Sequence, residues 1–143
     1  MRRTVVLLVM VAAMLALAGG TALTDTVGCT GGDCVGTRGA DTISGTSNID
    51  RIAGMEGNDQ IQGEGGSDQI YSDEGNDTIF DDSGSLDFDT IYGDEGNDTI
   101  LVAEGNGSPA GDTVDCGPGK KDKVTFDRDI DTIAKNCEIK KPQ

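Results

Sequence analysis

Ten aspartates recur at one position of a short repeated pattern, and each stands two residues before an isoleucine or a valine. They are Asp41, Asp50, Asp59, Asp68, Asp77, Asp89, Asp98, Asp112, Asp122 and Asp131. The residues before them are rich in glycine, which lets backbone carbonyl groups converge where a side chain would block them. A carboxylate added to such carbonyls suits a hard cation of high coordination number, so the pattern predicts calcium more readily than magnesium. Zinc, copper and iron lack their usual ligands, because the chain has no histidine.

The elements that must position these aspartates follow from a period of nine residues. Residues 36–80 divide without a gap into GTRGADTIS, GTSNIDRIA, GMEGNDQIQ, GEGGSDQIY and SDEGNDTIF. After an insertion at 81–88 the phase resumes with DTIY and GDEGNDTIL, and after a second insertion comes GDTVD. A β-branched residue always fills the eighth position, which suits a short strand with one buried face. The predicted core is one column of side chains: Ile43, Ile52, Ile61, Ile70, Ile79, Ile91, Ile100, Val114, Val124 and Ile133.

These units resemble the RTX, or haemolysin-type, calcium-binding nonapeptide G-G-x-G-x-D-x-U-x. GMEGNDQIQ and GDEGNDTIL match closely, and the resemblance extends over residues 36–113. The second-position glycine is replaced by threonine, methionine, glutamate or aspartate in the well-formed units. The resemblance implies an all-β fold, a parallel β-roll (a β-solenoid) in which each nonapeptide makes half a turn.

The implied fold arranges the calcium ligands in two rows, because successive loops fall on alternate sides of the roll. One row holds Asp41, Asp59, Asp77 and Asp98, and the other holds Asp50, Asp68 and Asp89. Each ion would lie between neighbouring loops of one row. We expect the strongest ligands where unbroken repeats lie on both sides, at Asp59, Asp68 and Asp77, and a less regular loop at Asp89.

Other acidic residues of the loops are expected to be solvated rather than to bind metal. They are Glu56, Asp73, Glu74, Asp94 and Glu95. The alternative for the whole pattern is a solenoid without metal, since asparagine, aspartate and glycine all favour turns.

The N-terminal residues indicate secretion. A charged start, MRR, precedes an apolar run over residues 4–18 that is short for a membrane span. We expect a signal peptide at 1–18, with cleavage after residue 22 as an alternative and an uncleaved membrane anchor as another. The remaining chain would comprise an N-terminal cap at 19–35, the β-roll at 36–115 and a C-terminal cap at 116–143.

Four cysteines fall in two pairs, Cys29 with Cys34 before the repeats and Cys116 with Cys137 after them. An even number in a secreted chain indicates disulfides, for which three connectivities exist. The ends of a roll of this length would be on the order of 20 Å apart, beyond disulfide reach. We therefore expect two local disulfides, one at each end. A zinc site built from all four cysteines would have to span the same distance between the two ends, so it is the weaker alternative.

Charge limits the partners. The formal net charge is −15, and without residues 1–18 the chain keeps 26 acidic and 9 basic residues, a net −17. Nucleic acid and anionic membranes are therefore not expected partners. Few apolar side chains oppose this repulsion, so we expect folding to depend on bound calcium.

The resulting prediction is a secreted, extracellular calcium-binding protein that is not an enzyme. No histidine is present to activate a serine or cysteine, and no G-x-S-x-G motif occurs. The roll and its caps also account for the whole chain after residue 18. The alternative function is an adhesive or glycan-recognition module that presents the outer face of the roll to cell-envelope or matrix polymers.

Overall fold

The computed structural model describes residues 24–81, 87–103 and 110–143, and the expected signal peptide lies outside the described residues. Every regular element in these ranges is a strand. The strands are β1 (Thr26–Gly28), β2 (Gly32–Val35), β3 (Thr42–Thr46), β4 (Asp50–Ala53), β5 (Gln60–Glu64), β6 (Gln69–Tyr71), β7 (Thr78–Phe80), β8 (Thr90–Tyr92), β9 (Thr99–Leu101), β10 (Thr113–Asp115), β11 (Lys123–Phe126), β12 (Thr132–Ile133) and β13 (Ile139–Pro142). Nothing in the described part of the chain qualifies as a membrane-spanning helix.

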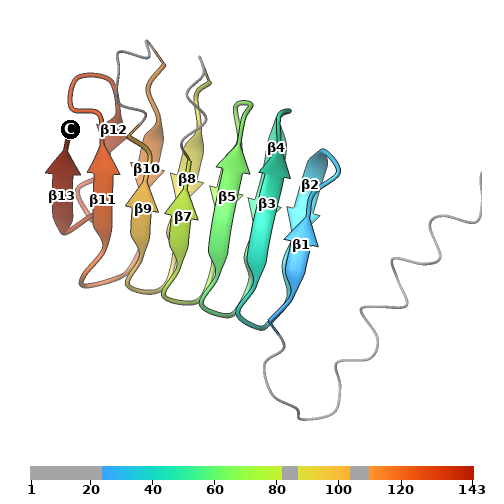
Figure 1. Ribbon diagram of the computed structural model, residues 1–143. Coiled ribbons are helices and arrows are strands. Elements are labelled where there is room, and N and C mark those ends of the chain that lie inside the picture. The colour runs from blue at the N-terminus through green and yellow to red at the C-terminus, as the bar shows by residue number, and fades with distance from the viewer. Residues whose placement is uncertain (1–23, 82–86, 104–109) are drawn as a thin grey trace, which may run out of the picture.

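The strands build two parallel sheets, and the chain changes sheet after every strand. The odd-numbered strands form a seven-stranded sheet in the order β1-β3-β5-β7-β9-β11-β13. The even-numbered strands form a six-stranded sheet in the order β12-β10-β8-β6-β4-β2. The two stacks run across the molecule from β1 and β2 to β13 and β12 (Figure 1). This all-β parallel solenoid is the β-roll predicted from the repeat.

The register of the sheets follows the nine-residue period. Ile43 pairs with Ile61, and Ile61 pairs with Ile79, so that equivalent residues two repeats apart lie side by side. Ile79 then pairs with Ile100, across the first insertion. A shift of one residue would turn the isoleucine column toward solvent. The insertion therefore leaves the strand register unchanged.

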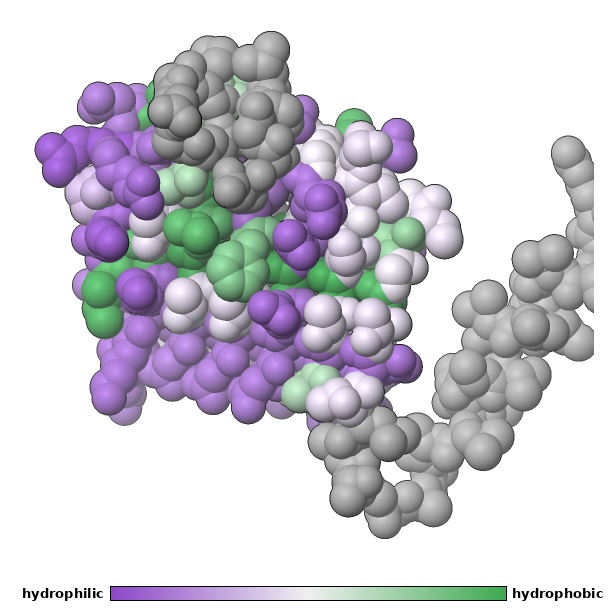
Figure 2. All heavy atoms as spheres, in the orientation of Figure 1, coloured by the Kyte–Doolittle hydropathy of each residue, from purple (hydrophilic) through white to green (hydrophobic). Residues whose placement is uncertain are grey.

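The core is the predicted column of β-branched side chains. Nine of its ten members, from Ile43 to Val124, are at most 1% exposed. Val27 and Cys34 extend the same cluster toward the N-terminus. Ile133, the last member, is only partly buried, because β12 is an edge strand of its sheet. On the face shown in Figure 2, apolar residues form a narrow band between hydrophilic ones.

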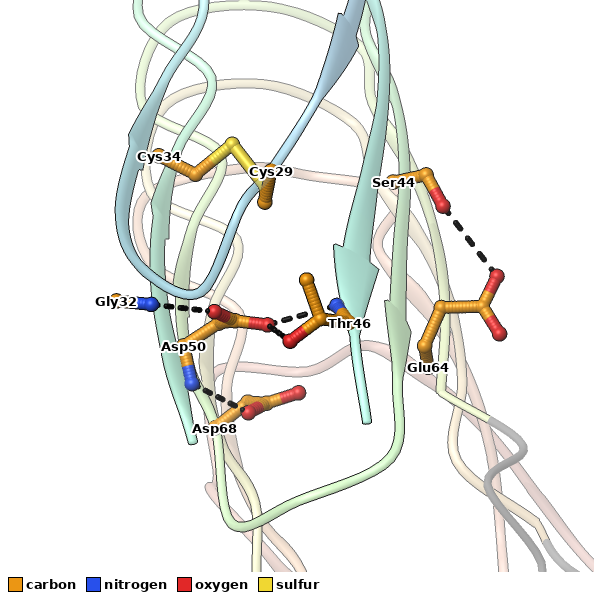
Figure 3. The surroundings of a disulfide bond; sticks show 8 residues. All are labelled: Cys29, Gly32, Cys34, Ser44, Thr46, Asp50, Glu64 and Asp68. Atoms are coloured by element: carbon orange, nitrogen blue, oxygen red, sulfur yellow. Dashed lines mark hydrogen bonds between the residues drawn. A yellow bond between two sulfur atoms is a disulfide. The ribbon is translucent and has the colours of Figure 1, made fainter. Parts of the chain in front are cut away.

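Disulfides close both ends of the roll, as expected. Cys29 and Cys34 are bonded with their Cα atoms 5.4 Å apart, and they join the residues that follow β1 to β2 (Figure 3). Cys116 and Cys137 are bonded with their Cα atoms 5.2 Å apart. No cysteine of the described residues is free, so the alternative zinc site is wrong. The segments expected as caps also contribute strands β1, β2, β11, β12 and β13 to the two sheets.

Candidate metal sites

The loops between strands bring the aspartates into two rows. In the first row, the backbone N–H of Asp41 donates to Oδ1 of Asp59 at 2.8 Å, and the N–H of Asp59 donates to Oδ1 of Asp77 at 2.7 Å. The N–H of Asp77 continues the row by donating to Oδ1 of Asp98 at 2.9 Å. One carboxylate oxygen of each aspartate therefore fixes the position of the preceding turn.

The second row uses the same contact on the opposite edge of the roll. The N–H of Asp50 donates to Oδ1 of Asp68 at 2.8 Å, and the N–H of Asp68 donates to Oδ1 of Asp89 at 2.6 Å. Asp89 donates in turn to Oδ1 of Asp112 at 2.9 Å. The seven predicted site residues thus lie in the two groups that the alternating loops imply, and all are at most 3% exposed.

The other oxygen of most of these carboxylates is buried and has no hydrogen-bond partner. This holds for Oδ2 of Asp59, Asp68, Asp77, Asp89, Asp98 and Asp122. A buried anionic oxygen without a partner is costly, unless a cation compensates for the lost hydration. The row of orphaned oxygens is therefore what a set of cation sites would present.

Backbone carbonyl groups lie beside these oxygens. A Cβ built on Gly54 would lie 2.6 Å from Oδ2 of Asp59 and 2.6 Å from the carbonyl oxygen of Ser72 in the next turn. A Cβ on Gly93 would lie 2.9 Å from Oδ2 of Asp98 and 2.9 Å from the carbonyl oxygen of Cys116. These distances are too short for a real side chain. Glycine at this position therefore keeps open a space lined by carboxylate and carbonyl oxygen, the donor set that calcium prefers.

Carboxylates alone would not complete such a site. In the described ranges, no three acidic or cysteine side chains gather as a metal-binding group. The absence of such a group excludes a shell made mainly of side chains. It leaves a shell in which carbonyl oxygens supplement one or two carboxylates, as the glycine cradles suggest.

The electrostatics of the rows oppose ionisation in the absence of a cation. Burial raises the pKa of Asp59 to about 6 and the pKa values of Asp68 and Asp98 to about 7. The amide hydrogen bond that each carboxylate accepts lowers the pKa, but charges of the same row, such as Asp77 and Asp41 beside Asp59, raise it again. A divalent cation between the loops would reverse this balance and favour the ionised form.

Asp41 and Asp50 differ from the rest of their rows, because their second oxygen is hydrogen-bonded within the loop. Thr37 donates its hydroxyl to Oδ2 of Asp41 at 2.9 Å. Thr46 donates both its backbone N–H, at 2.7 Å, and its hydroxyl, at 2.8 Å, to Oδ2 of Asp50 (Figure 3). At these two positions a threonine hydroxyl occupies the oxygen that a cation would use.

The missing second-position glycines have a structural consequence. The residues that replace them at Met55, Glu64, Asp73 and Asp94 have φ values of 83°, 70°, 66° and 53°. This left-handed conformation costs roughly 1–2 kcal/mol for a residue with a side chain, and less for aspartate. The loops therefore keep the backbone shape that glycine would allow, at a cost in stability.

Of the five acidic residues expected to be solvated, the three glutamates are exposed, whereas Asp73 and Asp94 are half-buried. Glu56, Glu74 and Glu95 are exposed and bridge successive turns through their backbone. Glu56 also forms an exposed ion pair with Arg38 at 3.5 Å.

Three buried aspartates were not among the predicted ligands. Asp112 is 2% exposed, and its Oδ1 accepts from the N–H of Asp89 at 2.9 Å. Asp122 is fully buried, with Oδ1 accepting from the N–H of Asp98 at 2.9 Å and Oδ2 without a partner. Its position among the ten regularly spaced aspartates could have identified it as a ligand. Asp81 is 2% exposed, and neither of its oxygens has a partner. It stands at the first residue of an insertion, where the repeat pattern assigned it no role.

The comparisons with known proteins agree with the repeat pattern. The family model of the RTX calcium-binding nonapeptide repeat matches residues 44–79 and 83–108, as four copies. No curated protein and no solved structure matches the chain.

Proposed function

We propose that this chain is a secreted calcium-binding β-roll whose folding is coupled to calcium, because residues 44–79 and 83–108 match the model of the RTX calcium-binding nonapeptide repeat, which implies Ca²⁺ binding. The proposed ligands are the predicted residues Asp41, Asp50, Asp59, Asp68, Asp77, Asp89 and Asp98, to which we add Asp122. The observation that carries the proposal is the series of buried Oδ2 atoms without hydrogen-bond partners.

The two oxygens of each aspartate have different tasks in this proposal. Oδ1 accepts the amide of the preceding turn and sets the spacing of the loops, as between Asp59 and Asp77. Oδ2 and nearby carbonyls, such as that of Ser72 beside Gly54, remain to hold the ion. Bound calcium supplies two positive charges between neighbouring loops. We expect the weakest binding at Asp41 and Asp50, where threonine competes for Oδ2.

Coupling of folding to calcium follows from charge and burial. Each half-turn contributes only one isoleucine or valine to the core, and the sequence carries a net charge of −15. Stacking the turns buries carboxylates one above another, which is unfavourable without counter-charge. A ligand that binds only the folded rows stabilises them in proportion to the logarithm of its concentration. The calcium-free chain is therefore largely unfolded.

Secretion fits both the family and the cysteines. RTX repeat proteins are generally extracellular, and the disulfides Cys29–Cys34 and Cys116–Cys137 suit an oxidising compartment. Calcium sites of extracellular modules commonly have dissociation constants of about 10⁻⁴ to 10⁻³ M. Such a protein would stay unfolded at low calcium during export and fold outside the cell.

The proposal assigns no catalytic activity to the roll. The buried carboxylates are engaged through Oδ1 with the preceding turn, which leaves them as structural ligands rather than as free acids or bases. RTX repeats themselves act by binding calcium.

A calcium titration followed by circular dichroism tests this function. In excess chelator, the oxidised protein should give the spectrum of an unfolded chain. Added calcium should convert it to a β spectrum, and magnesium at the same concentration should do so poorly. A complete β spectrum in chelator would show that the loops are turns that need no metal, and the proposed function would be wrong.

Adhesion to a polymer is the second candidate function. The rings of Tyr71 and Tyr92 stack on the outer face of the even-numbered sheet, with centroids 4.9 Å apart. The guanidinium carbon of Arg51 lies 5.4 Å from the Tyr71 ring centre. Half-buried aromatic side chains with a neighbouring cation can contact sugar rings. Sedimentation of the calcium-loaded protein with insoluble cell-wall polymers tests this function, and the variant Tyr71→Ala/Tyr92→Ala should remain in solution if these rings bind.

A further inference from the structure

Ser72 stands at a position that glycine holds in the neighbouring loops of the first row. Gly54 and Gly93 begin the loops that end in Asp59 and Asp98, and Ser72 begins the loop between them. The first residues of these three loops are equivalent in the stack, since the backbone N–H of each donates to the carbonyl oxygen of the residue that ends a strand in the next turn. Of the three, only Ser72 carries a side chain.

The side chain of Ser72 fills the space that the glycines leave open. Ser72 is fully buried, and its hydroxyl donates to the carbonyl oxygen of Gly93, in the next turn, at 2.7 Å. This carbonyl is the counterpart of the Ser72 carbonyl beside Gly54 and of the Cys116 carbonyl beside Gly93, each of which a built Cβ would approach too closely. At Ser72 a real side chain is present and is hydrogen-bonded to that carbonyl.

The hydroxyl of Ser72 also acts on the carboxyl group of its own loop, that of Asp77. Burial raises the pKa of Asp77, whereas the amide hydrogen bond from Asp59 and the hydroxyl of Ser72 lower it. The hydroxyl therefore lies close to a carbonyl and to a carboxyl group, the two kinds of group that line the cradles at Gly54 and Gly93. It takes the place that a cation would take between two turns.

We propose that Ser72 weakens the cation site at Asp77. The tight sites of the first row are then those with glycine cradles, at Asp59 and Asp98. This inference rests on the proposed calcium function. Calcium contacts its oxygen ligands directly, at about 2.3–2.6 Å, and a serine side chain leaves less room for it than glycine does. The ion also competes with the hydroxyl proton of Ser72 for the carbonyl oxygen of Gly93.

This order of affinities differs from the one expected from the repeats alone. The unbroken repeats on both sides of Asp77 favoured a strong site there, because spacing does not distinguish a cradle that begins with serine from one that begins with glycine. In exchange for a weaker ion, Ser72 supplies a contact between two turns that needs neither calcium nor an ionised carboxylate.

Calorimetric calcium titrations of the disulfide-bonded protein and of the variants Ser72→Gly and Ser72→Ala test the proposal. Ser72→Gly restores the residue of the neighbouring cradles and should tighten binding at one site by about threefold to tenfold, the factor that corresponds to the net strength of one hydrogen bond. Ser72→Ala removes the hydroxyl but keeps a Cβ in the space, so it should tighten binding less. The exposed residue Ser47 provides a matched control, because Ser47→Gly adds the same backbone freedom to a loop and should tighten no site.

The direction of the change separates the proposal from a purely structural role. If Ser72 only held two turns together, both variants would destabilise the roll and bind calcium more weakly, and this result would overturn the proposal. Unchanged affinities in Ser72→Gly would overturn it as well, and in both cases the calcium function would stand. Circular dichroism in saturating calcium should show the same β content in all four proteins, so that equally folded states are compared. A failure of the unaltered protein to bind calcium would overturn both this inference and the proposed function.

Discussion

The backbone amide of Asp59 donates a hydrogen bond to Oδ1 of Asp77, one full turn further along the roll, at 2.7 Å. The same aspartates keep their Oδ2 atoms buried and unpartnered. One side chain therefore both fixes the distance between two turns and leaves an oxygen for a ligand in the gap that it has fixed. Site geometry and fold depend on the same residues.

Removal of either carboxylate should remove bound calcium. Asp59→Ala and Asp77→Ala each delete an orphaned Oδ2 and the Oδ1 that accepts the amide of the preceding turn. Calorimetry should then give a lower calcium stoichiometry than for the unaltered protein. The exposed neighbour Glu74 supplies the control, since Glu74→Ala should leave the stoichiometry unchanged. If both aspartate variants bind the original number of ions, these residues are not ligands.

Acidification should favour the calcium-free roll. An unfolded aspartate has a pKa of 3.8, whereas folding raises the value to about 6 for Asp59 and about 7 for Asp68 and Asp98. The folded state binds more protons in this window. The contribution of these three carboxyl groups to the stability of the folded state is therefore fully present below about pH 4 and is lost as the pH rises through about 7.

Circular dichroism in excess chelator should show β content that increases as the pH falls from about 8 to about 4. Saturating calcium should reverse the trend, because protons and calcium compete for the same carboxylates. A calcium-free chain that stays equally unfolded across this range would contradict the raised pKa values.

Glycine at position 55 should stabilise the calcium-loaded protein. Met55 has a φ of 83°, which a side chain disfavours and glycine accepts. Met55→Gly should raise the free energy of unfolding by about 1 kcal/mol. Urea denaturation in saturating calcium measures this change. Asp94→Gly is the matched comparison and should gain less, because aspartate tolerates positive φ better. A loss of stability in Met55→Gly would show that its side-chain contacts outweigh the backbone cost.

The two disulfides should differ in their contributions. Cys116–Cys137 joins residues 21 apart, and Cys29–Cys34 joins residues 5 apart. The longer loop loses more conformational entropy in the unfolded chain, which gives about 3 kcal/mol against about 2 kcal/mol for the shorter loop. Urea denaturation of the double variants Cys116→Ala/Cys137→Ala and Cys29→Ala/Cys34→Ala, in saturating calcium, should show this order. The reverse order would indicate that the N-terminal end limits stability.

The repeat predicted the fold because period and residue type agree at every turn. The isoleucine column predicted the strands, the core and the register, and the alternation of the loops predicted the two aspartate rows. The pairing of Ile79 with Ile100 across an insertion was also predictable, since the phase resumes after it. Strand β13 was less evident, because Ile139–Pro142 has none of the pattern and forms by pairing with β11, which is already in place.

Details of individual sites were beyond the sequence pattern because they depend on which atom of a side chain is engaged. The spacing treats Asp50 and Asp59 alike, yet Thr46 donates to Oδ2 of Asp50 and nothing donates to Oδ2 of Asp59. Asp81 was assigned to an insertion, and only its position beside Gly63 reveals that it replaces a loop glycine. The positive φ of Met55 likewise follows from the loop conformation rather than from methionine.

The amide-to-carboxylate contacts run in one direction along the stack, and each turn touches only the turns beside it. Such an assembly behaves as a one-dimensional chain of coupled units, whose stability is a sum of terms for turns and for the interfaces between them. A destabilising substitution in a terminal turn weakens one interface between turns and shortens the cooperative unit slightly. The same substitution at Asp68 or Asp77 divides the stack into two short segments, so the tolerance of a position to mutation depends on its distance from the ends.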